Sequence, residues 1–207
     1  MMNAQKLFEV GMTQYRQHLA DYNADPHLIH PYLTALSRVV DVGGYKGDWT
    51  ARILNTYGPF VDVFEPVKEF VEHLRTRFQG DYRVSIHPVA LEDKHELRQI
   101  FLDEDSSSFF PDVKRQRKED IIVDDIATYP LGGADLISIN AEGSEYKILP
   151  RLIETNMISL FKNVQVQFHW TVPGANDLRN EIREKLSKTH IQQYCFPFVW
   201  ESWRRKY

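Results

Sequence analysis

The sequence of 207 residues contains a single cysteine, Cys195, so it can form no internal disulfide. Disulfides are characteristic of oxidising compartments, and their absence leads us to expect a cytoplasmic protein. Cys195 lies in the apolar stretch QYCFPFVW and has no basic neighbour in the sequence. This setting favours a packing role over a reactive thiol.

Long apolar runs, excess positive charge and zinc-ligand spacing are also missing. No stretch approaches the roughly 20 apolar residues that span a bilayer, and the first residues lack the apolar core of a secretion signal. The formal net charge of −4 provides no positive field for nucleic acid, so we predict no nucleic-acid partner and no membrane span. We predict no metal site, although a magnesium ion held by Glu142, Asn140 and another acid stays open.

Apolar residues alternate between helical and strand periodicity along the chain. Residues 8–22 have the spacing of an amphipathic helix, and Asp25-Pro26 predicts the start of a second short helix that ends before Arg38. Beyond it we expect strands at 38–42, 60–64, 82–91, 97–102, 121–126, 134–140, 163–170, 190–196 and 199–205, and helices at 47–56, 67–78, 144–154 and 176–188. This alternation indicates a parallel sheet with helices on both faces. No helix separates the last two strands, so one of them should run antiparallel.

Three glycines follow the first strong strand, in the stretch RVVDVGGYKGDWT. Ligands of open parallel sheets bind beyond the carboxyl ends of the strands, and glycines there allow a ligand to approach the backbone closely. An ordinary strand-to-helix turn is the alternative explanation. The next strand ends in Glu65-Pro66, where a carboxylate can accept hydrogen bonds from both ribose hydroxyls of a nucleoside, or act as a first-turn acid. Together the two signals predict an adenosine-type ligand.

The spacing of the glycines distinguishes between nucleoside cofactors. The nicotinamide fingerprint G-x-G-x-x-G requires a glycine at the position that Tyr45 occupies. Asp41, just before the turn, would repel a pyrophosphate but suits a ligand with an ammonium or sulfonium group. S-adenosylmethionine carries both groups. We predict that its amino-acid end lies across Asp41, Gly43, Gly44, Tyr45 and Gly47.

Four stretches, VVDVGGYKGDWT, VDVFEPVKEFVEHL, VSIHPVALED and DLISINAEGSEYKIL, occur in this order and resemble the FkbM-type family of S-adenosylmethionine-dependent methyltransferases. The resemblance covers residues 38–170, and FEP and EGSE are its most specific parts. It implies an α/β Rossmann-like methyltransferase fold, with a helical segment at 1–37 and an S-adenosylmethionine-binding domain at 38–207. It also implies O-methylation of a hydroxyl on a sugar, glycan or small metabolite. On these motifs we expect cofactor contacts from Glu65, Pro66, Ala90, Leu91 and Asn140.

Residues 138–145 carry the candidate chemistry. The family pattern K-I-D-V-E-G-A-E has Ser138 in place of lysine and Asn140 in place of aspartate here. Asn140 can hydrogen-bond the cofactor or the acceptor, or form a turn, and Glu142 can face the acceptor or act as a first-turn acid. His169 ends the next strand, where a neutral imidazole with a pKa near 6.5 could accept the hydroxyl proton, or bond to the backbone. We therefore predict His169, Glu142 and Asn140 as the catalytic residues.

Several points stay open in the sequence. The polar loop at 103–119 could form a lid over the site, and Trp170 could stack on a sugar or simply pack. A homo-oligomer is compatible with the sequence. Two other functions remain as alternatives: a non-catalytic binding module with a methyltransferase fold, and a nicotinamide-dependent oxidoreductase, which the missing glycine disfavours.

Overall fold

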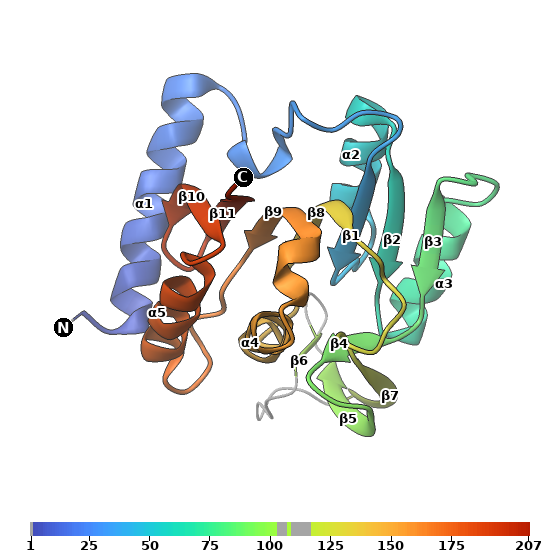
Figure 1. The fold of residues 1–207 in the computed structure, drawn as a ribbon. Coiled ribbons are helices and arrows are strands. Elements are labelled where there is room, and N and C mark those ends of the chain that lie inside the picture. The colour runs from blue at the N-terminus through green and yellow to red at the C-terminus, as the bar shows by residue number, and fades with distance from the viewer. Residues whose placement is uncertain (1, 103–106, 109–116) are drawn as a thin grey trace.

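The computed structural model describes residues 2–102, 107–108 and 117–207 (Figure 1). Its main sheet has seven strands in the order β10-β11-β9-β8-β1-β2-β3. They are β1 (Arg38–Val42), β2 (Phe60–Phe64), β3 (Val84–His87), β8 (Ala134–Ile139), β9 (Phe161–Val166), β10 (His190–Phe196) and β11 (Trp200–Arg205). Neighbouring strands are parallel except that β11 runs antiparallel to both β9 and β10. The predicted mostly parallel sheet with an antiparallel C-terminal strand is confirmed.

The central parallel strands end level with one another. Val42 of β1 is paired with Phe64 of β2 and with Ile139 of β8, and Ile139 is paired with Val166 of β9. The loops that follow these strands therefore gather at one edge of the sheet, called the carboxyl edge below. They comprise residues 43–47, 65–67, 140–144 and 167–174.

Helices cover both faces of the main sheet, as expected for parallel strands. In Figure 1, α4 (Glu145–Glu154) and α5 (Ala175–Leu186) lie on one side, and α2 (Asp48–Tyr57) and α3 (Lys68–Arg77) on the other. Alternate residues of β1 serve the two sides, since Val40 packs in a core with Leu149 of α4 and Val39 in a second core with Ile53 of α2. Within the described residues, no helix has both the length and the apolar composition for crossing a bilayer.

The first helix, α1 (Ala4–Tyr22), packs against β10 (Figure 1). The helix predicted to follow Asp25 is only the 3-10 turn Pro26–Leu28. Asp25 caps this turn as expected, because its carboxylate accepts a hydrogen bond from the N–H of His27. Pro31 lacks an N–H group and explains why the helix does not continue.

A second, smaller sheet, unforeseen in the sequence pattern, has the order β4-β7-β5-β6. Its strands are β4 (Ala90–Glu92), β5 (Glu96–Leu102), β6 (Ser107–Ser108) and β7 (Arg117–Asp125). The single strand expected over 82–91 was wrong, because β3 and β4 belong to different sheets. Pro88 between them cannot donate a ladder hydrogen bond, and the N–H of Val89 turns back to the carbonyl of His87. Most of the loop predicted as a lid, at 103–119, lies outside the described residues.

Replacing Gly11 by alanine tests how α1 is attached. Alanine is favoured over glycine within a helix by about 1 kcal/mol, so without a specific contact the change should stabilise the protein. A Cβ at Gly11, however, would lie 2.1 Å from the carbonyl oxygen of Pro197. We therefore expect Gly11→Ala to lower the free energy of unfolding in urea by about 1–3 kcal/mol. Gln14→Ala, on the exposed side of α1, is the control, and a stabilised Gly11→Ala protein would contradict the contact.

Candidate functional site

The glycine turn at the end of β1 is shaped by its protein neighbours. Gly43 has φ of +94°, and the N–H groups of Gly43 and Gly44 both donate to the carbonyl of Phe64. A Cβ at Gly43 would lie 1.9 Å from the carbonyl oxygen of Asn140, and one at Gly44 would lie 2.3 Å from Val63 Cγ1. We expected that the close approach of a ligand would require glycine at these two positions. The structure shows that the neighbouring loop and strand leave no room for a side chain there even without a ligand. A side chain at Gly43 would therefore disturb packing before it met any ligand.

Tyr45 and Gly47 complete the turn in left-handed backbone conformations. Tyr45 has φ of +46°, and its N–H donates to Oε2 of Glu65 at 2.8 Å. Gly47 has φ of +79° and is the N-cap of α2. The turn after β1 is thus held by the acid that follows β2.

Glu65 is buried at the carboxyl edge and accepts two backbone hydrogen bonds. Its oxygens take the N–H of Tyr45 and, across Pro66, the N–H of Val67 at 2.9 Å. Burial raises the pKa of Glu65 to about 7, although these two N–H groups act in the opposite direction and the charge of Asp41 adds to the rise. A carboxylate can accept about four hydrogen bonds, so positions for further donors remain.

Asp41 lies one strand away from Glu65, inside β1. It is buried, and the hydroxyl of Thr50 donates to its Oδ2 at 2.5 Å. Burial raises the pKa of Asp41 to about 6, and the bond from Thr50 only partly offsets this effect. The sequence prediction did not include Thr50.

Ala90 and Leu91 begin the small sheet and differ in their surroundings. Ala90 packs with Val67 and Phe70, next to Tyr45 of the glycine turn. Leu91 is almost fully buried in the main core, so its side chain is committed to packing. Of the two predicted contacts, Ala90 is therefore the one near the carboxyl edge.

Asn140 immediately follows β8. Its backbone N–H donates to the carbonyl of Val42, which fixes it beside the glycine turn. Its side-chain Oδ1 is buried and has no hydrogen-bond partner among the described residues. A buried acceptor without a donor is uncommon in folded proteins and requires an explanation.

Glu142 and Gly143 form a second left-handed turn at this edge. Their φ angles are +50° and +108°, and the value for glutamate is unusual for a residue with a side chain. The side chain of Glu142 is 39% exposed, whereas that of Glu145 is fully buried at the start of α4. Strained backbone of this kind is concentrated at functional sites.

His169 is clamped between these two glutamates. It lies in the loop after β9, three residues beyond Val166, whereas the sequence predicted a strand over 163–170 that would contain it. Its Nδ1 is 3.0 Å from Oε1 of Glu145, and its Nε2 is 3.5 Å from Oε1 of Glu142. Burial alone would lower the pKa of His169, but the charges and hydrogen bonds of Glu145 and Glu142 outweigh it and raise the pKa to about 10. The neutral imidazole expected from the sequence is thus an imidazolium at neutral pH.

Glu92 is a buried charge that the sequence prediction missed, although it stands within the motif VSIHPVALED. Its carboxylate accepts two bonds from Arg98, at 2.7 and 2.6 Å, and bonds from Ser144 and Lys147, both at 2.8 Å. Burial would raise the pKa of Glu92, but these donors outweigh it and hold the pKa below its usual range. Glu92 thereby connects the small sheet to the turn that carries Glu142. In the described part of the chain, no three His, Cys, Asp or Glu side chains are arranged to hold a metal ion.

Sequence comparisons give no match, whereas structural comparisons do. No protein-family model and no curated protein matches this sequence. A methyltransferase FkbM from Methylobacillus flagellatus KT has a similar structure, with a TM-score of 0.60 and 16% identity. The match covers 88% of this chain and 46% of that protein, so this chain spans about half its length.

Two further solved structures match over nearly their whole length. The N-methyltransferase NodS from Bradyrhizobium japonicum WM9, solved with S-adenosyl-L-homocysteine, has a TM-score of 0.51 at 9% identity, covering 99% of this chain and 98% of NodS. A candidate rRNA methylase from Clostridium thermocellum has a TM-score of 0.50 at 10% identity, covering 100% and 99%. The chain therefore has the Rossmann-like α/β fold of methyltransferases. The expectation of no nucleic-acid partner stays a prediction, because likeness at this level of identity shows the fold alone.

Replacing Glu145 by glutamine tests the clamp around His169. Removing this charge should lower the pKa of His169 from about 10 towards its ordinary value near 6.5. Proton–nitrogen correlation NMR of the histidine side chains across pH reports the change, and His169→Asn identifies the signal. Glu181→Gln, which alters an exposed pair with Lys185, should leave the pKa of His169 unchanged.

The same clamp has a pH-dependent effect on stability. Because the folded-state pKa of His169 is raised, its stabilising contribution is fully present below a pH of about 6.5 and is lost as the pH rises through about 10. Urea denaturation should show this loss in the wild type and a smaller one in Glu145→Gln. A wild-type His169 that titrates near 6.5 would contradict both expectations.

Proposed function

We propose that the protein is an S-adenosylmethionine-dependent O-methyltransferase that acts on a hydroxyl of a sugar, glycan or small metabolite. The observation that supports it most directly is the buried Oδ1 of Asn140, which has no partner in the described chain. Leaving such an acceptor unpaired costs about 1–3 kcal/mol, and a bound ammonium group would supply the missing donor. Asn140 adjoins the glycine turn, where ligands of open α/β sheets bind.

The other residues of the carboxyl edge fit the parts of this cofactor. Asp41 and Asn140 offer acceptors to its amino-acid end, and Glu65 has acceptor positions left for the ribose hydroxyls. Ala90 contributes apolar surface for the adenine ring. When bound, S-adenosylmethionine supplies a methyl group that its sulfonium has already activated. NodS, which shares this fold, was solved in complex with S-adenosyl-L-homocysteine, the product form of this cofactor, and this agrees with the assignment.

We assign proton removal from the acceptor hydroxyl to Glu142 and a positioning role to His169. An alcohol is a weak nucleophile unless its proton leaves as the new bond forms. His169 as an imidazolium has no lone pair to accept that proton, and both its nitrogens face carboxylates. Glu142 is the more exposed of the two carboxylates, and its ion pair with His169 orients it.

A methyl-transfer screen with labelled S-adenosylmethionine tests the activity. Nucleotide sugars, free glycans and small hydroxylated metabolites are the acceptors to include. Thermal shift with S-adenosylhomocysteine and with NAD separates the alternatives, because a ligand that binds only the folded state raises its stability. A shift with NAD alone would favour an oxidoreductase. A shift with S-adenosylhomocysteine but no transfer to any acceptor would favour a non-catalytic binding module.

Replacing Glu65 by glutamine tests the ribose contact while keeping an oxygen for one of the two backbone donors. Hydrogen bonds to a charged group contribute about 1.5–3 kcal/mol, so we expect S-adenosylhomocysteine to bind about tenfold or more weakly by calorimetry. Because the pKa of Glu65 is raised to about 7, wild-type affinity should fall as the pH drops through that value. The affinity of Glu65→Gln should fall only nearer pH 6, where Asp41 takes up a proton. Glu72→Gln, on the exposed side of α3, is the matched control. Equal affinity in Glu65→Gln and wild type would remove Glu65 from the cofactor site.

Replacing Glu142 by glutamine tests the proton acceptor. We expect kcat to fall by about 10²–10⁴-fold, with S-adenosylhomocysteine affinity within about threefold of wild type because the base acts only in the transition state. His169→Ala should also lower kcat, through loss of orientation of Glu142. Turnover of Glu142→Gln close to the wild-type rate, with an acceptor from the screen, would rule Glu142 out as the base.

A further inference from the structure

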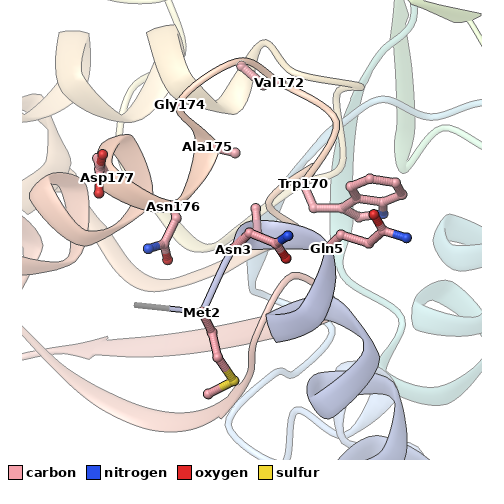
Figure 2. A pocket seen from close by; sticks show the side chains of 10 residues that line it. Met2, Asn3, Gln5, Trp170, Val172, Gly174, Ala175, Asn176 and Asp177 are labelled. Carbon is pink, nitrogen blue, oxygen red and sulfur yellow. The ribbon is translucent and has the colours of Figure 1, made fainter.

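A pocket of about 510 Å³ lies between the start of α1 and the loop that joins β9 to α5 (Figure 2). Its walls come from residues within 2–5 and 170–177. In Figure 2, Gln5 and Trp170 lie at one end, Asn176 and Asp177 at the other, and Asn3 between them. Trp170, at one end of the pocket, directly follows His169 of the clamp in the chain.

The side chains of this pocket have a definite chemical character. Three of them, Asn3, Gln5 and Asn176, are primary amides, which can both donate and accept hydrogen bonds. The Oδ1 of Asn3 already accepts the N–H of Lys6 as the cap of α1, so this residue has its amide N–H groups to offer. Of the described residues that line the pocket, Asp177 is the only one with a charged side chain. Sites for phosphate or carboxylate groups rely on lysine and arginine, and neither is present among these lining residues. Neutral hydroxyl groups, in contrast, match amides and a carboxylate well.

Trp170 provides a rigid apolar surface in the same pocket. Its ring is stacked on that of Phe8 of α1, with centroids 5.9 Å apart and planes inclined by 25°. The ring remains partly exposed, so it can pack against the apolar face of a bound ring. A side chain that is already fixed loses little conformational entropy when a ligand binds.

We propose that this pocket binds the methyl acceptor, and that the acceptor presents an uncharged, polyhydroxylated ring rather than a phosphorylated or otherwise anionic group. The proposal rests on the function proposed above and narrows its substrate class. It also makes α1, expected from the sequence to lie outside the cofactor-binding domain, one wall of the acceptor site. A polyanion such as RNA does not fit a pocket whose only charged wall residue, within the described chain, is an aspartate.

Binding of neutral methyl glycosides to the full chain, saturated with S-adenosylhomocysteine, tests the proposal. The probes are the methyl glycosides of glucose, galactose, mannose and rhamnose, with the corresponding sugar phosphates and a short single-stranded RNA for comparison. Saturation-transfer NMR at about 10 mM detects affinities in the millimolar range. We expect at least one glycoside to bind and the phosphates and RNA to bind more weakly.

Variants assign the binding to this pocket. Trp170→Ala and Asn176→Ala should each weaken glycoside binding by about tenfold, since the first removes the stacking surface and the second a hydrogen-bonding amide. Tyr82→Ala removes a highly exposed aromatic ring elsewhere, and Asn55→Ala removes an amide from a separate pocket. Both controls should bind glycoside as the wild type does.

The affinity for S-adenosylhomocysteine, measured by calorimetry without sugar, separates two kinds of failure. If S-adenosylhomocysteine binds but no glycoside does, or if phosphates or RNA bind as well as glycosides, the pocket proposal is overturned and the proposed cofactor site stands. Unchanged glycoside binding in both pocket variants overturns it as well. If a glycoside binds here and S-adenosylhomocysteine does not, the proposed methyltransferase function fails and only the assignment of the pocket to a neutral polyhydroxylated ring survives.

Discussion

The buried carboxylate of Glu92 is the contact on which the carboxyl edge depends. Taking an ion out of water costs several kcal/mol unless well-placed donors compensate, and here Arg98, Ser144 and Lys147 supply them all. Arg98 belongs to the small sheet, whereas Ser144 and Lys147 belong to the start of α4. The small sheet and the turn with Glu142 are therefore joined through the charge of Glu92. Loss of any of its donors would lower the free energy of unfolding substantially. A sheet that the sequence pattern did not reveal is thus the support for the candidate chemistry.

The polar groups of the carboxyl edge fall into two sets. Glu92 and Glu145 have donors on both oxygens, supplied by the protein itself. Asp41 and Glu65 have raised pKa values because burial is not fully compensated, and Asn140 keeps an oxygen without a partner in the described chain. The second set lies at the ends of adjacent strands β1, β2 and β8. This separation distinguishes carboxylates that hold the fold together from polar groups whose hydrogen bonding a ligand would complete.

The sequence predicted those parts of the fold that depend on the local pattern of apolar residues. Apolar runs such as 38–42 and 60–64 identify central strands, and parallel strands bring Gly43, Glu65 and Asn140 to one edge whatever the details of packing. The small sheet could not be predicted in this way, because apolar pattern identifies strands such as 96–102 and 117–125 without showing that they pair with each other rather than with the main sheet. The protonation of His169 also escaped prediction, since it depends on two glutamates that only the folded turn brings to the ring. The helix expected between Asp25 and Arg38 was wrong in its extent, although Pro31 is a sequence signal that could have shortened it.

The place of β11 has a consequence for the order in which the sheet can be completed. β11 follows β10 along the chain but lies between β9 and β10, and its Glu201 forms a buried ion pair with Arg179 of α5. While residues 200–205 are still being synthesised, β10 has no neighbour in the sheet and β9 has an open edge, which is a template for pairing with other chains. Until β11 is in place, the guanidinium of Arg179 also lacks the carboxylate of Glu201. The insertion of β11 between β9 and β10 therefore closes the sheet and neutralises a buried charge in the same step.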